Sequence, residues 1–334
     1  MKRTFTIFLA LLLVLALPGC SGGPVPGGTP SPVGKATLRA VGDIYLTDAM
    51  LDAARCSDGS YDFSAQFAGI IPALAEADLT LANFEGNFDS APYGRDLASY
   101  PDALAKTLSA AGIDLLQTAN TFSIFNGMAG MERTKSVIEA QGMTAFGTYV
   151  SAADRESNQV IVREINGIRI AFVAFTKGLG GMGLPTGSEY CVNLLYTDYT
   201  SNYEVIDYDG IRAVMKAARG TNPDLIVAAL HWGSENTRDV SKSQESIANL
   251  LIDCGADLIL GSHSHLAAPI EERAVRMDNG EDIQNRFRVL DIDSALALYE
   301  TNYYDRISDS LYEALTAARE RLEGYVHPPV DDAE

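Results

Sequence analysis

Cysteine is scarce in this chain of 334 residues, and no two cysteines are closely spaced. The four are Cys20, Cys56, Cys191 and Cys254. Disulfide frameworks and zinc ribbons need cysteines in even sets or close pairs, so this spacing excludes both. Cys254 ends an apolar-periodic segment, which predicts that it is a small buried hydrophobe.

Positive charge is also scarce. Lysine and arginine together number 25 against 44 acidic residues, and the formal net charge is −19. Such a chain repels phosphate backbones and anionic headgroups, which argues against nucleic acid or an anionic lipid surface as a partner. The acidity fits an extracytoplasmic protein, and also a protein that handles cations.

The apolar run from Ile7 to Leu17 is too short for a comfortable transmembrane helix. Lys2 and Arg3 precede it, and Leu17-Pro-Gly-Cys20 follows it, as in a bacterial lipobox. We therefore expect a lipoprotein signal peptide over 1–20, with lipid on Cys20 holding an extracytoplasmic domain at the bacterial membrane. The alternative is a plain signal peptide with an incidental cysteine. The Gly/Pro/Ser-rich residues 21–35 are expected to form a tether.

The remaining chain shows no internal repeat and no second linker, which favours one domain over 36–300 followed by a C-terminal helix and acidic tail over 301–334. Short apolar runs alternate with helical patterns, as is typical of an α/β fold with a largely parallel sheet. The runs 159–165 and 168–175 flank Asn166-Gly167, a strong hairpin signal that adds an antiparallel portion. The Gly-rich segment 177–185 lacks the Gly-Lys-Ser/Thr of a phosphate-binding loop and receives no nucleotide role.

Polar side chains end five of the apolar runs. In open α/β sheets, ligands bind beyond the carboxyl ends of the strands, so these side chains are candidates for a common site. Oxygen and imidazole donors suit Mn, Fe, Zn or Mg, and a cation favours ionised carboxylates beside neutral imidazoles. The candidates are Asp43, Asn83, Glu85, Asn120, His231, His263 and His265.

Several candidates also have a purely structural interpretation. Asp43 could cap a helix beginning near Ile44, Asn120 could cap a loop, and His231 could be a satisfied core histidine. Histidine occurs four times in the chain, and two of the four stand at His263 and His265. Residues i and i+2 of an extended segment point the same way, so this pair is the strongest prediction of a metal site. His327, near the terminus, is expected to have no role.

At these residues the sequence resembles the bacterial capsule-synthesis CapA family, the poly-γ-glutamate capsule biosynthesis proteins. The resemblance runs from about residue 35 to about residue 270 and rests on an ordered set of four motifs. They are Gly42-Asp43, Asn83-Phe84-Glu85, His231-Trp232-Gly233-Ser234-Glu235 and Gly261-Ser262-His263-Ser264-His265. It implies a calcineurin-like metallophosphoesterase fold, in which a β-sandwich with mixed sheets is flanked by helices. It also implies a role in making, anchoring or trimming an anionic γ-glutamyl polymer at the cell surface.

One motif departs from the family. Members usually have Ala-Asn-Asn-His followed by Asp and Gly, whereas this chain has Ala119-Asn120 followed by Thr121, Phe122 and, at the Asp position, Phe125. In related phosphoesterases the Asn-His supplies a metal ligand and a proton donor, and phenylalanine can be neither. The family's Ser-Leu-Gly-Asn-Phe segment is also missing; residues 290–298 stand near its place.

Three hypotheses follow from the resemblance. In the first, the chain is a metal-dependent hydrolase of an amide or phosphoester, with Asp43, Glu85, His231, His263 and His265 as metal ligands. Catalytic roles then fall to His231, Glu85 and Asn120. Asn83 and Asn120 would orient the substrate, Phe122 would contact it, and Glu235 would orient His231.

In the second hypothesis, the chain is a non-catalytic, lipid-tethered binding or scaffold subunit that kept the fold and lost the proton donor. A substrate-binding lipoprotein of a transporter is a third and weaker hypothesis. Partners expected under the first two are the cell-surface polymer and other capsule-synthesis subunits.

Overall fold

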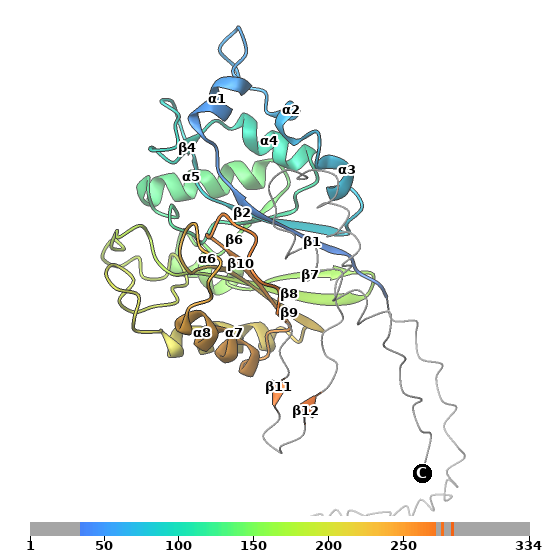
Figure 1. Cartoon of the computed structure of the whole chain (residues 1–334), viewed down its shortest axis with the longest axis vertical. Helices are drawn as coiled ribbons and strands as arrows, with labels where there is room; N and C mark the ends of the chain where they lie inside the picture. Colours follow the sequence, from blue (N-terminus) through green and yellow to red (C-terminus); the bar gives the residue numbers. More distant parts are fainter. Residues whose placement is uncertain (1–33, 272–274, 277–281, 284–334) are drawn as a thin grey trace, which may run out of the picture. The chain divides into compact units, whose positions relative to one another are not determined.

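The computed structural model describes residues 34–271, 275–276 and 282–283 (Figure 1). These residues belong to one structural unit that begins at Gly34. The expected signal peptide, the lipidation site Cys20, nearly all of the tether, the C-terminal helix and His327 lie outside the described residues. No helix in the described ranges is long and apolar enough to cross a membrane.

The first of two four-stranded sheets is entirely parallel, with the order β1-β2-β5-β6. Its strands are β1 (Leu38–Ile44), β2 (Leu79–Phe84), β5 (Leu115–Gln117) and β6 (Thr144–Phe146). Every residue of β2 and β5 is buried. Strands that are covered on both faces read as near-continuous apolar runs, and β2 does so except at Thr80 and Asn83.

The second sheet has the order β10-β9-β8-β7, in which only β7 is antiparallel. Its strands are β7 (Ile161–Ile165), β8 (Ile168–Thr176), β9 (Leu225–His231) and β10 (Leu258–Ser262). Asn166 and Gly167 join β7 to β8 with φ of 51° and 82°. Positive φ at both central residues is the geometry of a tight hairpin turn, so the predicted hairpin is confirmed.

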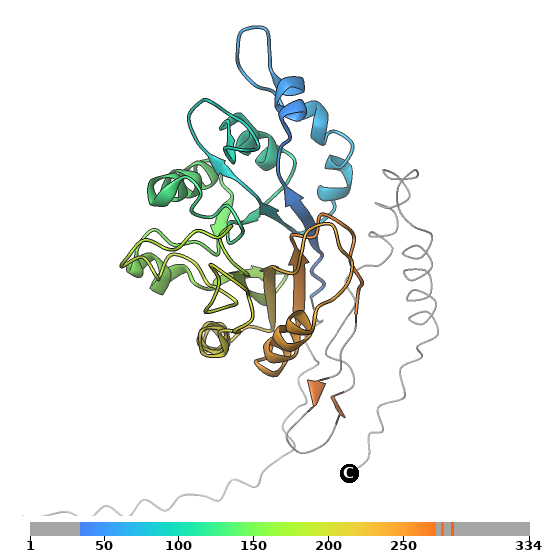
Figure 2. The ribbon, with the colours of Figure 1, turned by 60° about the vertical axis from the view of Figure 1, so that its left-hand side comes forward.

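Helices cover the outer face of each sheet (Figures 1 and 2). Helices α1 to α5 contribute side chains to a core cluster with the first sheet, and α7 and α8 do so with the second. The helices are α1 (Asp48–Ala54), α2 (Ser64–Phe67), α3 (Ile71–Leu74), α4 (Ala103–Ala110), α5 (Gly127–Ala140), α6 (Ala152–Asn158), α7 (Tyr208–Gly220) and α8 (Lys242–Asp253). Cys254, which follows α8, is buried in the second cluster, as predicted.

A third core cluster lies between the sheets. Leu81 of β2 and Phe172 of β8 belong to it, whereas their neighbours Ala82 and Val173 belong to the outer clusters. This alternation follows from the two-residue period of a strand. The predicted β-sandwich flanked by helices is therefore confirmed, with one sheet mixed and the other entirely parallel.

Two short pairs complete the described elements. One joins β3 (Asn87–Phe88) to β4 (Ser99–Tyr100) in parallel, and the other joins β11 (Val275–Arg276) to β12 (Asp282–Ile283) in antiparallel orientation. The first pair matters for the site because β3 follows Glu85 almost at once, and β4 closes the loop that carries Arg95.

Candidate functional site

The first sheet supplies two carboxylates. Asp43 lies near the carboxyl end of β1, opposite Asn83 of the parallel neighbour β2, and Glu85 follows the last residue of β2. The Asn83 amide donates a hydrogen bond from Nδ2 to Asp43 Oδ1 over 2.7 Å. The alternative in which Asp43 caps a helix is wrong, because α1 begins at Asp48 and its cap is Thr47.

The second sheet supplies three imidazoles. His231 is the last residue of β9 and pairs in register with Ser262, the last residue of β10. His263 and His265 follow with φ of 98° and 54°. The expectation that this pair projects from an extended segment is therefore wrong. Positive φ is costly for residues with a Cβ and tends to cluster at functional sites, where the surrounding structure enforces it.

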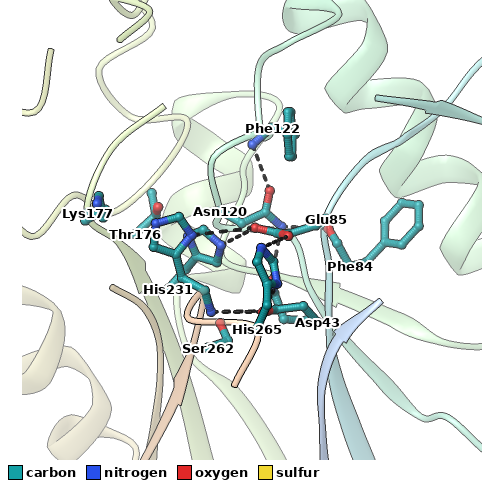
Figure 3. Close-up of polar contacts among 12 residues, drawn as sticks. Asp43, Phe84, Glu85, Asn120, Phe122, Thr176, Lys177, His231, Ser262 and His265 are labelled. Carbon is teal, nitrogen blue, oxygen red and sulfur yellow. Dashed lines mark hydrogen bonds and ion pairs between the residues drawn. The ribbon is translucent and has the colours of Figure 1, made fainter. Parts of the chain in front are cut away.

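The five side chains meet at one place, and Figure 3 labels four of them, Asp43, Glu85, His231 and His265. His231 Nε2 forms a hydrogen bond with Glu85 Oε1. His265 Nδ1 lies 3.0 Å from Asp43 Oδ2, and His265 Nε2 lies 3.7 Å from Glu85 Oε2. His263 Nδ1 lies 3.9 Å from Glu85 Oε1, and the His263 backbone N–H donates to Asp43 Oδ2 over 3.0 Å. The carboxylates come from one sheet and the imidazoles from the other.

The protonation states suit a cation. Burial alone would raise the pKa of Glu85, but His231 and His263 outweigh it and hold the pKa at about 2. Burial lowers the pKa of His231, and the bond to Glu85 opposes this only in part. Glu85 is therefore ionised at neutral pH, and His231 favours its neutral form, the pair of states that a metal ion requires.

Three buried imidazole nitrogens in this cluster have no hydrogen-bond partner, namely Nδ1 of His231, His263 and His265. His265 Nδ1 approaches Asp43 without hydrogen-bond geometry. Buried polar atoms are nearly always satisfied, so an orphaned set of this kind indicates a ligand. Three overlapping groups bring candidate ligand atoms within 4.8 Å of one another: Glu85 with His231 and His263, Asp43 with Glu85 and His265, and Glu235 with His263 and His265. Nitrogen and carboxylate oxygen donors in these numbers fit a divalent metal.

The two predicted asparagines are hydrogen-bonded to each other. Asn120 donates from Nδ2 to Asn83 Oδ1 and to Phe84 O, over 3.1 and 2.6 Å, and its Oδ1 accepts from the Phe122 backbone N–H over 3.0 Å. Asn83 is 2% exposed and Asn120 is 1% exposed. Both amides are thus occupied in a chain of hydrogen bonds that ends on Asp43. Asn120 has the loop-capping geometry that was its structural alternative, and the two amides connect Asp43 to the loop after β5; their predicted roles toward a substrate stay predictions.

Phe122 lies above Asn120 in Figure 3, partly exposed. Its ring packs edge-on against Phe125, with ring centroids 5.7 Å apart, and its carbonyl accepts a hydrogen bond from Asn87 Nδ2. Phe125 is itself 39% exposed. This rim of the site is apolar and offers no group that exchanges a proton.

Glu235 was expected to orient His231, and the structure places it elsewhere. Its carboxylate lies within 4.8 Å of ligand atoms of His263 and His265, while His231 Nδ1 has no hydrogen-bond partner. Glu235 is exposed. It is therefore a rim acid beside the histidine pair.

The sequence analysis missed three residues next to the cluster. The Tyr45 ring lies 4.9 Å from the His265 ring, and the Arg95 guanidinium lies 4.4 Å above Tyr45. Lys177, directly after β8, donates from its backbone N–H to His231 O and from Nζ to Gly233 O. Burial lowers the pKa of Lys177. Only its position after a strand end could have marked Lys177, and nothing in the sequence ties Arg95 to the site.

A glycine lets the histidine-bearing loop approach its neighbour. A Cβ on Gly261 would lie 2.6 Å from Trp232 Nε1. Trp232 follows His231, and its backbone N–H donates to Ser262 O over 3.2 Å. The absent side chain at Gly261 therefore sets the distance between the segments that carry His231 and His263.

Two curated proteins are similar to this chain. The Capsule biosynthesis protein CapA of Bacillus anthracis is 26% identical over 244 residues, covering 70% of this chain and 55% of that protein. The PGA biosynthesis protein CapA of Bacillus subtilis is 25% identical over 211 residues, covering 61% and 52%. The chain thus spans about half the length of the curated relatives it matches.

Among solved structures, a putative 5'-nucleotidase from Staphylococcus aureus aligns with a TM-score of 0.43 at 11% identity, covering 83% of this chain and 62% of that one. A TM-score below 0.5 is too low to establish a common fold.

The family model described as "Bacterial capsule synthesis protein PGA_cap" matches residues 37–282, which include all five clustered side chains. The chain therefore belongs to the bacterial capsule synthesis protein family.

Proposed function

We propose that this chain is a metal-dependent hydrolase that acts on a γ-glutamyl polymer during capsule biosynthesis, anchoring or trimming. The observation that carries the proposal is the cluster of two carboxylates and three imidazoles, in which three buried nitrogens are unpaired. The names of the two CapA relatives support the substrate class. The bond to be cleaved is an amide or a phosphoester.

In the proposed site, some side chains would bind the metal ion and others position those ligands. Asp43, Glu85, His231, His263 and His265 would hold the ion, which as a Lewis acid polarises the scissile group and activates water. Asn83 and the His263 backbone N–H fix the two oxygens of Asp43. Glu85 keeps its negative charge through His231. These contacts prepare the ligand set before the substrate arrives.

The test is a comparison of metal content and activity. The purified chain, loaded with Mn²⁺, is expected to bind at least one ion and to cleave a γ-glutamyl polymer or a phosphoester in a metal-dependent manner. Arg212→Gln, on the outer helix α7, provides a control for purification and handling. Absence of both bound metal and activity would contradict the proposal.

A second candidate function is supported by Phe122 and Phe125. A pair of partly exposed aromatic rings beside the cluster, where a proton donor is expected by resemblance, suits a subunit that binds polymer without cleaving it. Aromatic surfaces also serve contacts with other capsule-synthesis subunits.

Restoration of the family's motif separates the two functions. The double variant Thr121→Asn/Phe122→His is expected to raise metal-dependent activity at least tenfold if the metal ligands function and only the proton donor is missing. If the wild type and this variant both hold metal but remain inactive, the binding function is favoured instead.

We also propose that Cys20 carries lipid and holds the domain outside the bacterial membrane. The support is the basic start, the short apolar run and the Leu17-Pro-Gly-Cys20 sequence. The wild-type chain is expected to partition with membranes, and Cys20→Ala is expected to abolish this. Unchanged partitioning of the variant would refute the anchor.

A further inference from the structure

The substrate class proposed above raises an electrostatic difficulty. The chain has a net charge of −19, and a γ-glutamyl polymer carries a free carboxylate on each residue. Repulsion between like charges opposes their association. Three of the chain's carboxylates, those of Asp43, Glu85 and Glu235, lie at the cluster itself. An acidic polymer therefore needs a cation beside the metal site that is not already neutralised.

Arg95 meets this requirement. It is exposed, and among the described residues no carboxylate lies within salt-bridge distance of its guanidinium. In contrast, Arg39, Arg133, Arg169 and Arg212 each have a carboxylate within 4.0 Å. The Tyr45 side chain and the more distant charge of Glu235 raise the pKa of Arg95, but neither pairs it with a carboxylate at salt-bridge distance, so its charge is available to a ligand.

The placement of Arg95 relative to the cluster is fixed by an aromatic stack. Its guanidinium lies 4.4 Å above the centre of the Tyr45 ring, and the Tyr45 ring lies 4.9 Å from that of His265. Tyr45 directly follows β1, the strand that carries Asp43. A cation over a tyrosine face is held by the ring quadrupole, and a guanidinium carries five N–H donors, so those that do not contact Tyr45 can donate to a ligand.

The loop that carries Arg95 is anchored at its backbone. The Arg95 N–H donates to Asp48 Oδ1 over 3.0 Å, and its carbonyl accepts from the Ala98 N–H over 2.9 Å. Gly94 and Ser99 exchange two hydrogen bonds across the base of the loop, of 3.0 and 3.2 Å. The backbone is therefore ordered before a ligand arrives, which reduces the entropy lost on binding.

We propose that Arg95, stacked on Tyr45, binds a carboxylate of the γ-glutamyl polymer at the His265 side of the metal cluster. The guanidinium presents a planar pair of N–H donors that matches the two oxygens of a carboxylate. Arg95 is thus a substrate-binding residue, and Tyr45 is a positioning residue that acts through it. This inference rests on the proposed function for its substrate class.

Direct binding to the purified full chain tests the proposal, measured by calorimetry in the presence of Mn²⁺. The probes are a γ-glutamyl oligomer and its methyl ester, which has the same backbone without the charges. Arg95→Gln is expected to weaken binding of the acidic oligomer about 10- to 100-fold, the range for a lost charge-assisted pair, and Arg95→Lys by less. The ester is expected to bind weakly and equally to the wild type and to Arg95→Gln.

Matched controls exclude general effects. Arg212 is also an exposed arginine over a tyrosine ring, 5.6 Å above Tyr208, but it lies on α7, away from the cluster. Arg212→Gln is expected to bind the acidic oligomer like the wild type. Tyr45→Phe keeps the ring and is expected to keep most of the affinity, whereas Tyr45→Leu is expected to lose it with metal content unchanged.

Three outcomes would overturn the inference: Arg95→Gln binding the acidic oligomer as tightly as the wild type, the ester binding as tightly as the acid, or no binding of the acid to the wild type. A chain that binds the oligomer through Arg95 but cleaves nothing would refute the hydrolase function and leave the inference intact. In an active chain, Arg95→Gln is expected to raise KM about 10- to 100-fold with a smaller change in kcat.

Discussion

Two groups of charged side chains in the described part of this protein are built in opposite ways. Lys135 of α5 pairs with Asp154 of α6, and its Nζ lies 2.7 Å from both carboxylate oxygens. Asp154 also accepts from the Val150 N–H and from Asn158 Nδ2. The cluster at Asp43 and Glu85 instead gathers two like charges and leaves three imidazole nitrogens unpaired.

The difference separates a structural group from a functional one. A buried ion pair whose members are fully hydrogen-bonded needs nothing more and positions the helices that carry it. A buried set with orphaned nitrogens is costly as it stands and becomes favourable when a cation binds. The two groups differ both in charge pairing and in hydrogen-bond completeness, and it is the unpaired nitrogens that indicate a missing ligand.

The largest expected effect comes from removing the histidine pair. His263→Ala/His265→Ala is expected to lower metal affinity by about a thousandfold or more, because two donors of the cluster are lost. Metal analysis after dialysis measures this. Added Mn²⁺ is expected to raise the Tm of the wild type and not that of the variant. If the variant retained metal, the histidine cluster would not be a metal site, and its distinction from the structural Lys135–Asp154 pair would be lost.

The next effect concerns the structural pair. Asp154→Asn is expected to reduce the free energy of unfolding by up to about 3 kcal/mol, because Lys135 keeps its charge in a buried position and retains only Glu139, whose Oε1 lies 3.9 Å from Nζ. Urea denaturation at neutral pH measures the change. The metal content of Asp154→Asn is expected to equal that of the wild type. A variant that lost both stability and metal would contradict the separation of the Lys135–Asp154 pair from the metal cluster.

A smaller effect is expected at the glycine that spaces the site. Gly261→Ala places a Cβ 2.6 Å from Trp232 Nε1, so one segment has to shift. We expect a stability loss of about 1 to 3 kcal/mol, typical of overpacking, together with a measurable loss of metal affinity. Gly183→Ala, where an added Cβ meets nothing within 4 Å, provides the control.

The smallest effect is a pH dependence. The pKa of Asp154 lies below its ordinary value, because Lys135 and the other hydrogen bonds outweigh the effect of burial. Its contribution to stability is thus fully present above the ordinary carboxyl pKa of about 3.9 and is lost as the pH falls through the folded-state pKa. The free energy of unfolding, measured from pH 6 to pH 3, is expected to become more similar in the wild type and in Asp154→Asn as the pH falls. If the difference in free energy of unfolding between the two proteins were the same at every pH, the Lys135–Asp154 pair would have no electrostatic role in stability.

Much of the fold could be predicted from the sequence because the relevant signals are local. The β7–β8 hairpin follows from Asn166-Gly167, and β9 from an apolar run between two helical patterns. Asp43, Glu85, His231 and the histidine pair could be predicted to lie together because each follows or ends a strand, and parallel strands present their carboxyl ends at the same edge of a sheet.

The remaining features depend on tertiary packing. The positive φ of His263 and His265 is enforced by contacts such as the one between the His263 N–H and Asp43, 220 residues apart in the chain. The engagement of Asn83 and Asn120 with Asp43 depends on the register of β1 and β2. Arg95 reaches the site through a loop between two-residue strands, for which no periodic pattern exists.

The division of the ligand set between the sheets has a dynamic consequence. Asp43 and Glu85 belong to one sheet and the three histidines to the other, so an ion bound among them would join β1 and β2 to β9 and β10 directly. Loss of the ion would leave the His231–Glu85 and His263–Asp43 contacts to restrain the sheets at this edge. Amide hydrogen exchange in the last residues of β1 and β10 should therefore slow when metal binds, while exchange in β6 and β7, the far edges of the two sheets, stays the same.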